Sequence, residues 1–245
     1  LMRSSAASDV YKRQVLSSGN GNVFQVCFTD PNQGIASAQY IAENKLPTKI
    51  GIIYDSSDVY SSGIEEKFEA EAKTQGLNIV SKAAFTADSK TDFGTQLQKA
   101  KDAGADLLFL PIYYQEASII LKQASDKDFH PQFFGCDGMD GILSVKNFDQ
   151  SLAEGLMLLI PFTVDEAGSQ DFVKAYEEAY GIEPLQFGAG AYDAVYAIKA
   201  AAEVLVGVSA GAAASAGVFA LITVIGILPR WAGHTRTARH VSLYE

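Results

Sequence analysis

The stretch KIGIIYDSSDVYSSG, Lys49 to Gly63, decides the fold class of this chain of 245 residues. Its first six residues, Lys49 to Tyr54, form a short Ile-rich apolar run, which is typical of a parallel strand buried on both faces. Residues with helical spacing follow from Asp58 to Gln75, and Gly76 is placed to end that helix. The segment therefore predicts one strand followed by one helix.

The same order of strand and helix repeats along the chain. We expect further strands at Leu77–Phe85, Ala105–Leu110, Pro131–Gly135 and Gly155–Pro161, and further helices at Asp92–Ala103 and Tyr114–Lys127. The strand starts near residues 49, 77, 105 and 132 are 28, 28 and 27 residues apart, which is the length of a βα unit. The repeat predicts an α/β fold, a doubly wound parallel sheet with helices over both faces.

Segments outside this repeat do not extend it regularly. A strand is expected at Val23–Thr29, and helices are expected at Gly34–Lys45, Ser169–Tyr180 and Gly188–Glu203. We interpret residues 23–203 as the folded region, with one lobe at about 31–162. The pieces 23–30 and 163–203 then belong to another lobe, reached through crossings near Asp30 and Phe162.

The two ends of the chain differ from the middle. Residues 1–22 are rich in Ser and Ala, lack the apolar stretch of a signal peptide and a lipobox cysteine, and resemble a translated sequencing adapter, so we expect them to be unstructured and artefactual. Val204 to Leu228 is 25 residues without a charge, which predicts a transmembrane-like helix, and the basic residues that follow place its end in the cytoplasm. The alternative is a buried Ala-rich core helix. Residues 204–245 are thus expected to form a hydrophobic helix and a basic tail.

Composition excludes several functions. The net charge of −10 argues against nucleic acid as a partner. The two cysteines, Cys27 and Cys136, have no metal-ligand spacing with the three histidines, and small buried side chains are the favoured interpretation. No nucleotide-binding, hydrolase or metalloprotease motif is present, and nothing beside Asp137 and Asp140 suggests a nucleophile. We therefore expect no enzyme, no cofactor and no metal.

The loops that follow the expected strands hold the candidate site residues. Tyr60, Tyr113 and Asp137 each lie shortly after a different strand, and ligands of open parallel sheets bind beyond the carboxyl ends of the strands. The carboxylate of Asp137 can pair with the ammonium group of a free amino acid, and the tyrosines can offer hydroxyls and ring faces. Each residue also has a structural alternative: Tyr60 packs its ring on the sheet, Tyr113 is half-buried, and Asp137 caps a turn.

Several stretches, taken in order, resemble a known family. They are FQVCFTDPNQG (24–34), KIGIIYDSSDVYSSG (49–63), residues 106–124, FGCDGMD (134–140), AEGL (153–156) and FGAGAYDA (187–194). This ordered set resembles the type I periplasmic-binding-protein family of the leucine/isoleucine/valine kind and covers residues 23 to 203.

The resemblance implies a function. It implies an extracellular or periplasmic substrate-binding component of an ABC importer for amino acids, a cell-surface lipoprotein whose two lobes close on the ligand and whose partners are the permease subunits. It further implies that Tyr60, Tyr113 and Asp137 are contacts of the second lobe, and that Phe187 lies near the cleft from the first lobe. A ligand-sensing receptor or regulator of the same fold is the alternative.

The chain also departs from the family pattern. Tyr60-Ser61-Ser62-Gly63 replaces the usual Tyr-Gly-x-Gly, and the resemblance implies that the first half of lobe one, with its Ser/Thr loop for the ligand carboxylate, is absent. We therefore predict no amino-acid binding measurable by calorimetry for this chain. The tail from Gly207 resembles a small stage V sporulation membrane protein, so a chimera joined near residues 203–207 is a further hypothesis.

Overall fold

The computed structural model describes residues 28–224, and its sheet carries the repeat expected from the sequence. The strands are β1 (Lys49–Asp55), β2 (Asn78–Phe85), β3 (Leu107–Leu110), β4 (Gln132–Gly135) and β5 (Met157–Leu158). All neighbours pair in parallel, in the order β2-β1-β3-β4-β5. The predicted parallel sheet is thereby confirmed.

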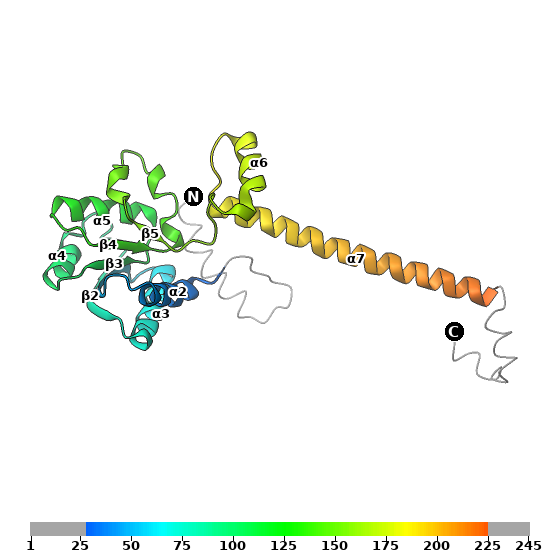
Figure 1. The fold of residues 1–245 in the computed structure, drawn as a ribbon, viewed down its shortest axis with the longest axis horizontal. Coiled ribbons are helices and arrows are strands. Elements are labelled where there is room, and N and C mark those ends of the chain that lie inside the picture. The colour runs from blue at the N-terminus through cyan, green and yellow to red at the C-terminus, as the bar shows by residue number, and fades with distance from the viewer. Residues whose placement is uncertain (1–27, 225–245) are drawn as a thin grey trace. The chain divides into compact units, whose positions relative to one another are not determined.

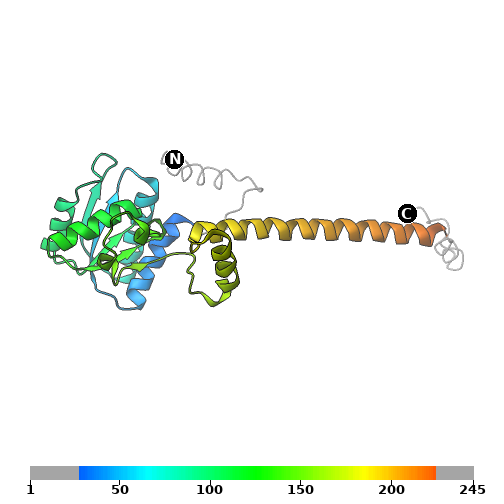
Figure 2. The ribbon, with the colours of Figure 1, turned by 90° about the horizontal axis from the view of Figure 1, so that it is seen from above.

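Helices cover both faces of this sheet (Figures 1 and 2). The helices of the repeat are α2 (Asp30–Glu43), α3 (Val59–Gln75), α4 (Gly94–Asp102) and α5 (Tyr114–Asp126). One core cluster joins the sheet to α2 and α3, and another joins it to α4 and α5. Alternate residues of β3 point to opposite faces of the sheet. Leu107 and Phe109 belong to the cluster with α2 and α3, and Leu108 and Leu110 belong to the cluster with α4 and α5. All four side chains are fully buried. This explains why the strand is apolar without interruption.

The ends of the helices follow local chemistry. Asp58 accepts a hydrogen bond from the backbone N–H of Tyr60 at 3.4 Å and begins α3, and Gly76 ends it at φ 72°. Helix α2 begins four residues earlier than the expected Gly34, because Pro31 suits the first turn of a helix, where no backbone donor is needed. Of the expected strand Val23–Thr29, Phe28 and Thr29 are not in a strand, and the rest lies outside the described residues.

Short 3-10 turns follow β4, among them η1 (Asp137–Met139), η2 (Ile142–Ser144) and η3 (Gln150–Ala153), and η4 (Ala167–Ser169) precedes α6. The expected strand Gly155–Pro161 is wrong in length, since only the two residues of β5 pair with β4. Beyond it lie α6 (Gln170–Tyr180) and the first residues of α7 (Gln186–Val224).

The chain divides into two units, residues 1–190 and 191–245, and the second consists of the remainder of α7 within the described range. The expected helix Gly188–Glu203 is wrong in its extent, because α7 continues without a break through residues 203–207. By length and composition alone, residues 186–212 could cross a membrane, and no residue of the most apolar 18-residue window of this helix is buried in this structure. This window starts before the expected span 204–228, whose last four residues lie outside the described part of the chain.

Candidate functional site

The loops after β1, β3 and β4 meet at one edge of the sheet, as predicted. The hydroxyl of Tyr60 donates a hydrogen bond to Asp137 Oδ1 at 2.6 Å. The ring of Tyr60 stacks on that of Tyr113, with centroids 4.9 Å apart and planes inclined by 22°. Three side chains that are distant in the sequence therefore form one cluster.

Tyr60 supports this cluster from inside the core. Its side chain is only 4% exposed, and its hydroxyl also accepts a hydrogen bond from the backbone N–H of Gly138 at 2.8 Å. Burial raises the pKa of Tyr60 well above its ordinary value, and electrostatic interactions with Cys136 and with the Asp137 carboxylate raise it further. The hydroxyl thus stays protonated at neutral pH and acts as a donor to Asp137, so in this structure Tyr60 holds the carboxylate while its own ring packs on the sheet.

The glycine after Asp137 is required by close packing. A Cβ at Gly138 would lie 2.8 Å from the Tyr60 hydroxyl oxygen and 3.0 Å from the carbonyl oxygen of Ile112. A Cβ at Gly135, at the end of β4, would collide with the sulfur of Met139. Both glycines allow a close backbone approach at this edge of the sheet.

Asp137 is held at three of its polar atoms. Its backbone N–H donates to Gln33 Oε1 at 3.0 Å, and its backbone carbonyl accepts from Gln186 Nε2 at 2.8 Å. Because Tyr60 occupies Oδ1, the carboxylate is fixed in orientation, while its Oδ2 has no hydrogen-bond partner among residues 28–224. The arrangement is that of an oriented anion with one oxygen left to bind a cationic group.

Sequence reasoning missed both glutamines. Gln33 and Gln186 are 1% and 6% exposed, and they come from α2 and from the start of α7. The sequence around a glutamine in a helix does not indicate which distant residue its side chain will bind. A buried amide needs a hydrogen bond, so burial, had it been known, would have indicated such a role.

Phe187 lies at the start of α7 with 72% of its side chain exposed. The role of Phe187 in the site stays a prediction. The neighbouring Gln186 makes two contacts here: besides holding the backbone carbonyl of Asp137, its backbone N–H donates to Asp140 Oδ2 at 3.3 Å. Burial raises the pKa of Asp140, partly offset by its hydrogen bonds from backbone N–H groups. Asp140 thus faces the first turn of α7, where a negative charge is favourable.

A small cavity of about 260 Å³ adjoins this point. Gln186 and Asp140 form part of its wall, and the rest is largely apolar, including Ile142, Leu158 and Phe162. Gln186 thus lines this apolar cavity and also donates to the backbone carbonyl oxygen of Asp137.

Nothing in this region forms a metal centre. Among residues 28–224, no group of three or more His, Cys, Asp or Glu side chains is arranged to hold a metal ion. Cys136 is fully buried as a free thiol with its sulfur 4.0 Å from Ser37 Oγ, and burial raises its pKa, which suits a small core side chain. Cys27 lies outside the described residues.

A protein-family model with the description "periplasmic binding protein" matches residues 10–223 of this chain. The match includes parts of the two ends that were expected to lie outside the folded region, 1–22 and 204–245. The proposed chimera and its join remain predictions.

Named relatives are binding proteins. The Leu/Ile/Val/Thr-binding protein of Salmonella typhimurium is 30% identical over 61% of this chain and 41% of the relative, and the leucine-specific-binding protein of the same organism is 28% identical over 65% and 46%. The chain spans about half the length of the curated relatives it matches.

Solved structures agree with the fold. A leucine-binding protein of Thermotoga maritima is 26% identical with a TM-score of 0.59, over 74% of this chain and 52% of that one. A branched-chain amino acid transporter substrate-binding protein of Streptococcus pneumoniae, solved with isoleucine, is 27% identical with a TM-score of 0.57, over 69% and 48%.

Proposed function

This chain belongs to the periplasmic binding protein family, and from that premise we propose that it supplies one wall of a site for a free amino acid, with a branched-chain amino acid as the ligand. The observation that carries the proposal is the state of Asp137. Three of its polar atoms are held by Gln33, Tyr60 and Gln186, and one carboxylate oxygen is left at the edge of the sheet.

The chemistry of this carboxylate matches an ammonium group. An ammonium ion has three donors and prefers a charge-assisted hydrogen bond to a carboxylate oxygen. Tyr113, stacked on Tyr60, adds an aromatic surface beside it, and such a surface suits both a cation and an aliphatic chain. The apolar cavity beside Gln186 supports a ligand with an aliphatic side chain.

The wider role is transport. Relatives are named for binding leucine, isoleucine, valine or threonine, and one structural relative is named as a transporter component. These names favour the substrate-binding component of an ABC importer over a sensor or regulator. Permease subunits are then the protein partners, the protein works outside the cytoplasm, in the periplasm or at the cell surface, and it carries out binding without catalysis.

One wall alone must bind weakly. The chain spans about half the length of its relatives, and the proposed wall offers the ligand one carboxylate oxygen of Asp137 and one aromatic face. A charge-assisted hydrogen bond with one aromatic contact amounts to about 4 kcal/mol at most, which corresponds to a Kd of about 1 mM or weaker. Calorimetry at micromolar protein should therefore show no binding.

A titration followed by nuclear magnetic resonance tests the proposal. The chain is labelled with ¹³C-tyrosine and titrated with L-leucine, and the ring signals of Tyr113 should move and saturate in the millimolar range. N-acetyl-L-leucine is the matched control ligand, because it lacks the ammonium group. Asp137→Asn is the matched variant, because it keeps the shape and loses the charge. Equal shifts with both ligands, or in both proteins, would refute an ammonium site at Asp137.

A further inference from the structure

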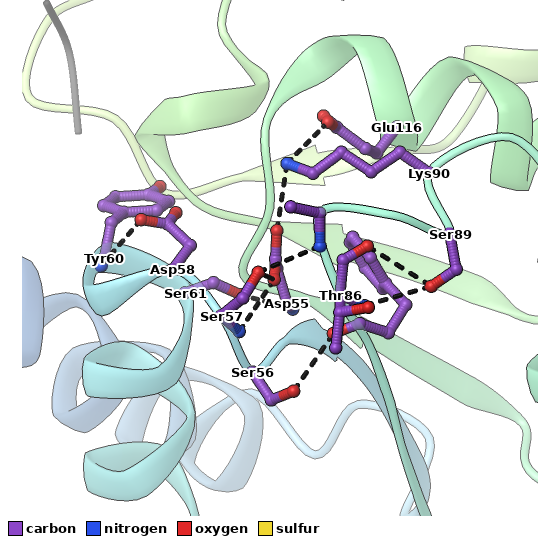
Figure 3. A network of polar contacts seen from close by, with 12 residues as sticks. Asp55, Ser56, Ser57, Asp58, Tyr60, Ser61, Thr86, Ser89, Lys90 and Glu116 are labelled. Atoms are coloured by element: carbon purple, nitrogen blue, oxygen red, sulfur yellow. Dashed lines mark hydrogen bonds and ion pairs between the residues drawn. The ribbon is translucent and has the colours of Figure 1, made fainter. Parts of the chain in front are cut away.

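A lysine from the loop after β2 joins the two segments that carry the stacked tyrosines. Lys90 Nζ lies 2.9 Å from Asp55 Oδ2 and 3.2 Å from Glu116 Oε1 (Figure 3). Asp55 ends β1, before the loop to Tyr60, and Glu116 lies in the first turn of α5, after Tyr113. We propose that Lys90 is a positioning residue that sets the separation of Tyr60 and Tyr113, and so the shape of the site beside Asp137.

The contact reaches Tyr60 through Asp55. Asp55 is 3% exposed, and its Oδ1 accepts from the backbone N–H and the hydroxyl of Ser57 at 2.9 and 2.6 Å. Its own backbone N–H donates to the hydroxyl oxygen of Ser61 at 2.8 Å, and Ser61 is fully buried next to Tyr60 in α3. The position of the Asp55 carboxylate therefore governs the turn from which Tyr60 extends (Figure 3).

The contact reaches Tyr113 through Glu116. Glu116 is 8% exposed, and its Oε2 is buried with no hydrogen-bond partner among residues 28–224. Lys90 is therefore the group that balances its charge. Glu116 lies within one turn of Tyr113, whose carbonyl accepts the hydrogen bond from the backbone N–H of Ala117 at 3.0 Å. A shift of Glu116 would move the start of α5 and with it the ring of Tyr113.

Electrostatics show why Lys90 is needed at this point. Burial lowers the pKa of Lys90, but its bonds with Asp55 and Glu116 outweigh this and leave the pKa raised, so the side chain is charged at neutral pH. Without Lys90, two buried carboxylates would face each other with no cation between them. Like charges in a desolvated place repel strongly, and relief requires the two loops to separate.

The chain contains a matched ion pair between β2 and α3. Lys82 Nζ on β2 lies 3.1 Å from Glu65 Oε1 and 2.6 Å from Glu69 Oε2, both on α3. The side chain of Glu65 is 8% exposed, much like that of Glu116. Lys82 and Lys90 are alike in that each bridges two carboxylates, at least one of which is buried. They differ in that Lys90, and not Lys82, joins the segment that holds Tyr60 to the segment that holds Tyr113.

The experiment compares Lys90→Met, Lys90→Arg and Lys82→Met in the full chain labelled with ¹³C-tyrosine, without ligand. Tyr60→Phe and Tyr113→Phe assign the two ring signals, whose positions report the mutual stacking of the rings. We expect Lys90→Met to move both signals, Lys90→Arg to restore them, and Lys82→Met to leave them in place even where urea unfolding shows a similar loss of stability.

A milder variant decides the matter if Lys90→Met does not fold. Glu116→Gln removes one arm of the bridge and leaves Lys90 paired with Asp55. The start of α5 should then shift, and both ring signals should move because the two rings stack on each other. Unchanged ring signals in Lys90→Met, or in Glu116→Gln where Lys90→Met fails to fold, would overturn the proposal, as would equal movement in Lys82→Met. The proposal rests on the proposed function, because it concerns the shape of the proposed amino-acid site. The tyrosine signals are measured without any amino acid, so a negative result for Lys90 can be told apart from a negative leucine titration.

Discussion

Replacing Tyr60 by Phe removes one oxygen atom from the buried centre of the site. The ring keeps its place in the core and its stacking on Tyr113, so no cavity of ring size forms. Two hydrogen bonds disappear, the one to Asp137 Oδ1 at 2.6 Å and the one from the backbone N–H of Gly138 at 2.8 Å. The variant therefore isolates the contribution of the hydroxyl.

The size of the loss follows from these two bonds. A hydrogen bond to a charged group contributes about 1.5–3 kcal/mol, and a buried donor left without a partner costs about 1–3 kcal/mol. Because Asp137 is only partly buried, water can replace part of the first bond. We expect Tyr60→Phe to lower the free energy of unfolding by about 3 kcal/mol. For a chain of this size, that is a fall in Tm of about 6–12 °C.

Urea unfolding followed by far-ultraviolet circular dichroism measures this difference. Tyr40→Phe is the matched control, since Tyr40 is 41% exposed and its hydroxyl has no hydrogen-bond partner among the residues the structure describes. That control should change stability by less than about 0.5 kcal/mol. A loss for Tyr60→Phe no larger than that of Tyr40→Phe would refute the role of the hydroxyl as a buried support of Asp137.

Three further variants test other parts of the molecule. Gly138→Ala should lower the free energy of unfolding by about 1–3 kcal/mol in urea, because its Cβ would lie 2.8 Å from the Tyr60 hydroxyl oxygen; an unchanged midpoint would contradict this packing. Phe68→Ala should cost about 3–5 kcal/mol by the same measurement, because the ring is fully buried and stacks on Phe109 at 3.9 Å; a loss below about 1 kcal/mol would show that the core is not packed as described. Burial raises the pKa of Asp140, so the wild type should lose stability relative to Asp140→Asn as the pH rises from about 3 to about 6, and a flat difference in urea midpoints would disprove that shift.

Much of the fold follows from local patterns. The apolar run Lys49–Tyr54, the helical spacing after Asp58 and the final Gly76 predicted β1 and α3 within one or two residues. The spacing of the strand starts predicted the parallel sheet, because a βα unit has a characteristic length. The weakest prediction was β5, since an apolar run shows that a segment is buried and does not show how many of its residues find a partner strand.

The cluster of Tyr60, Tyr113 and Asp137 was also predictable, because the carboxyl ends of parallel strands meet at one edge of a sheet. What each residue does there was not. The sequence left open whether Tyr60 faces a ligand or the core, and the structure buries it and gives its hydroxyl to Asp137.

Contacts between residues that are distant along the chain could be identified only from the tertiary structure. Gln33 reaches Asp137 across 104 positions, Gln186 reaches it across 49, and Lys90 joins Asp55 to Glu116. Strand and helix periods are set by neighbouring residues and can be read from the chain. A hydrogen bond between distant side chains depends on packing that brings them within about 3 Å, and only the folded chain determines that distance.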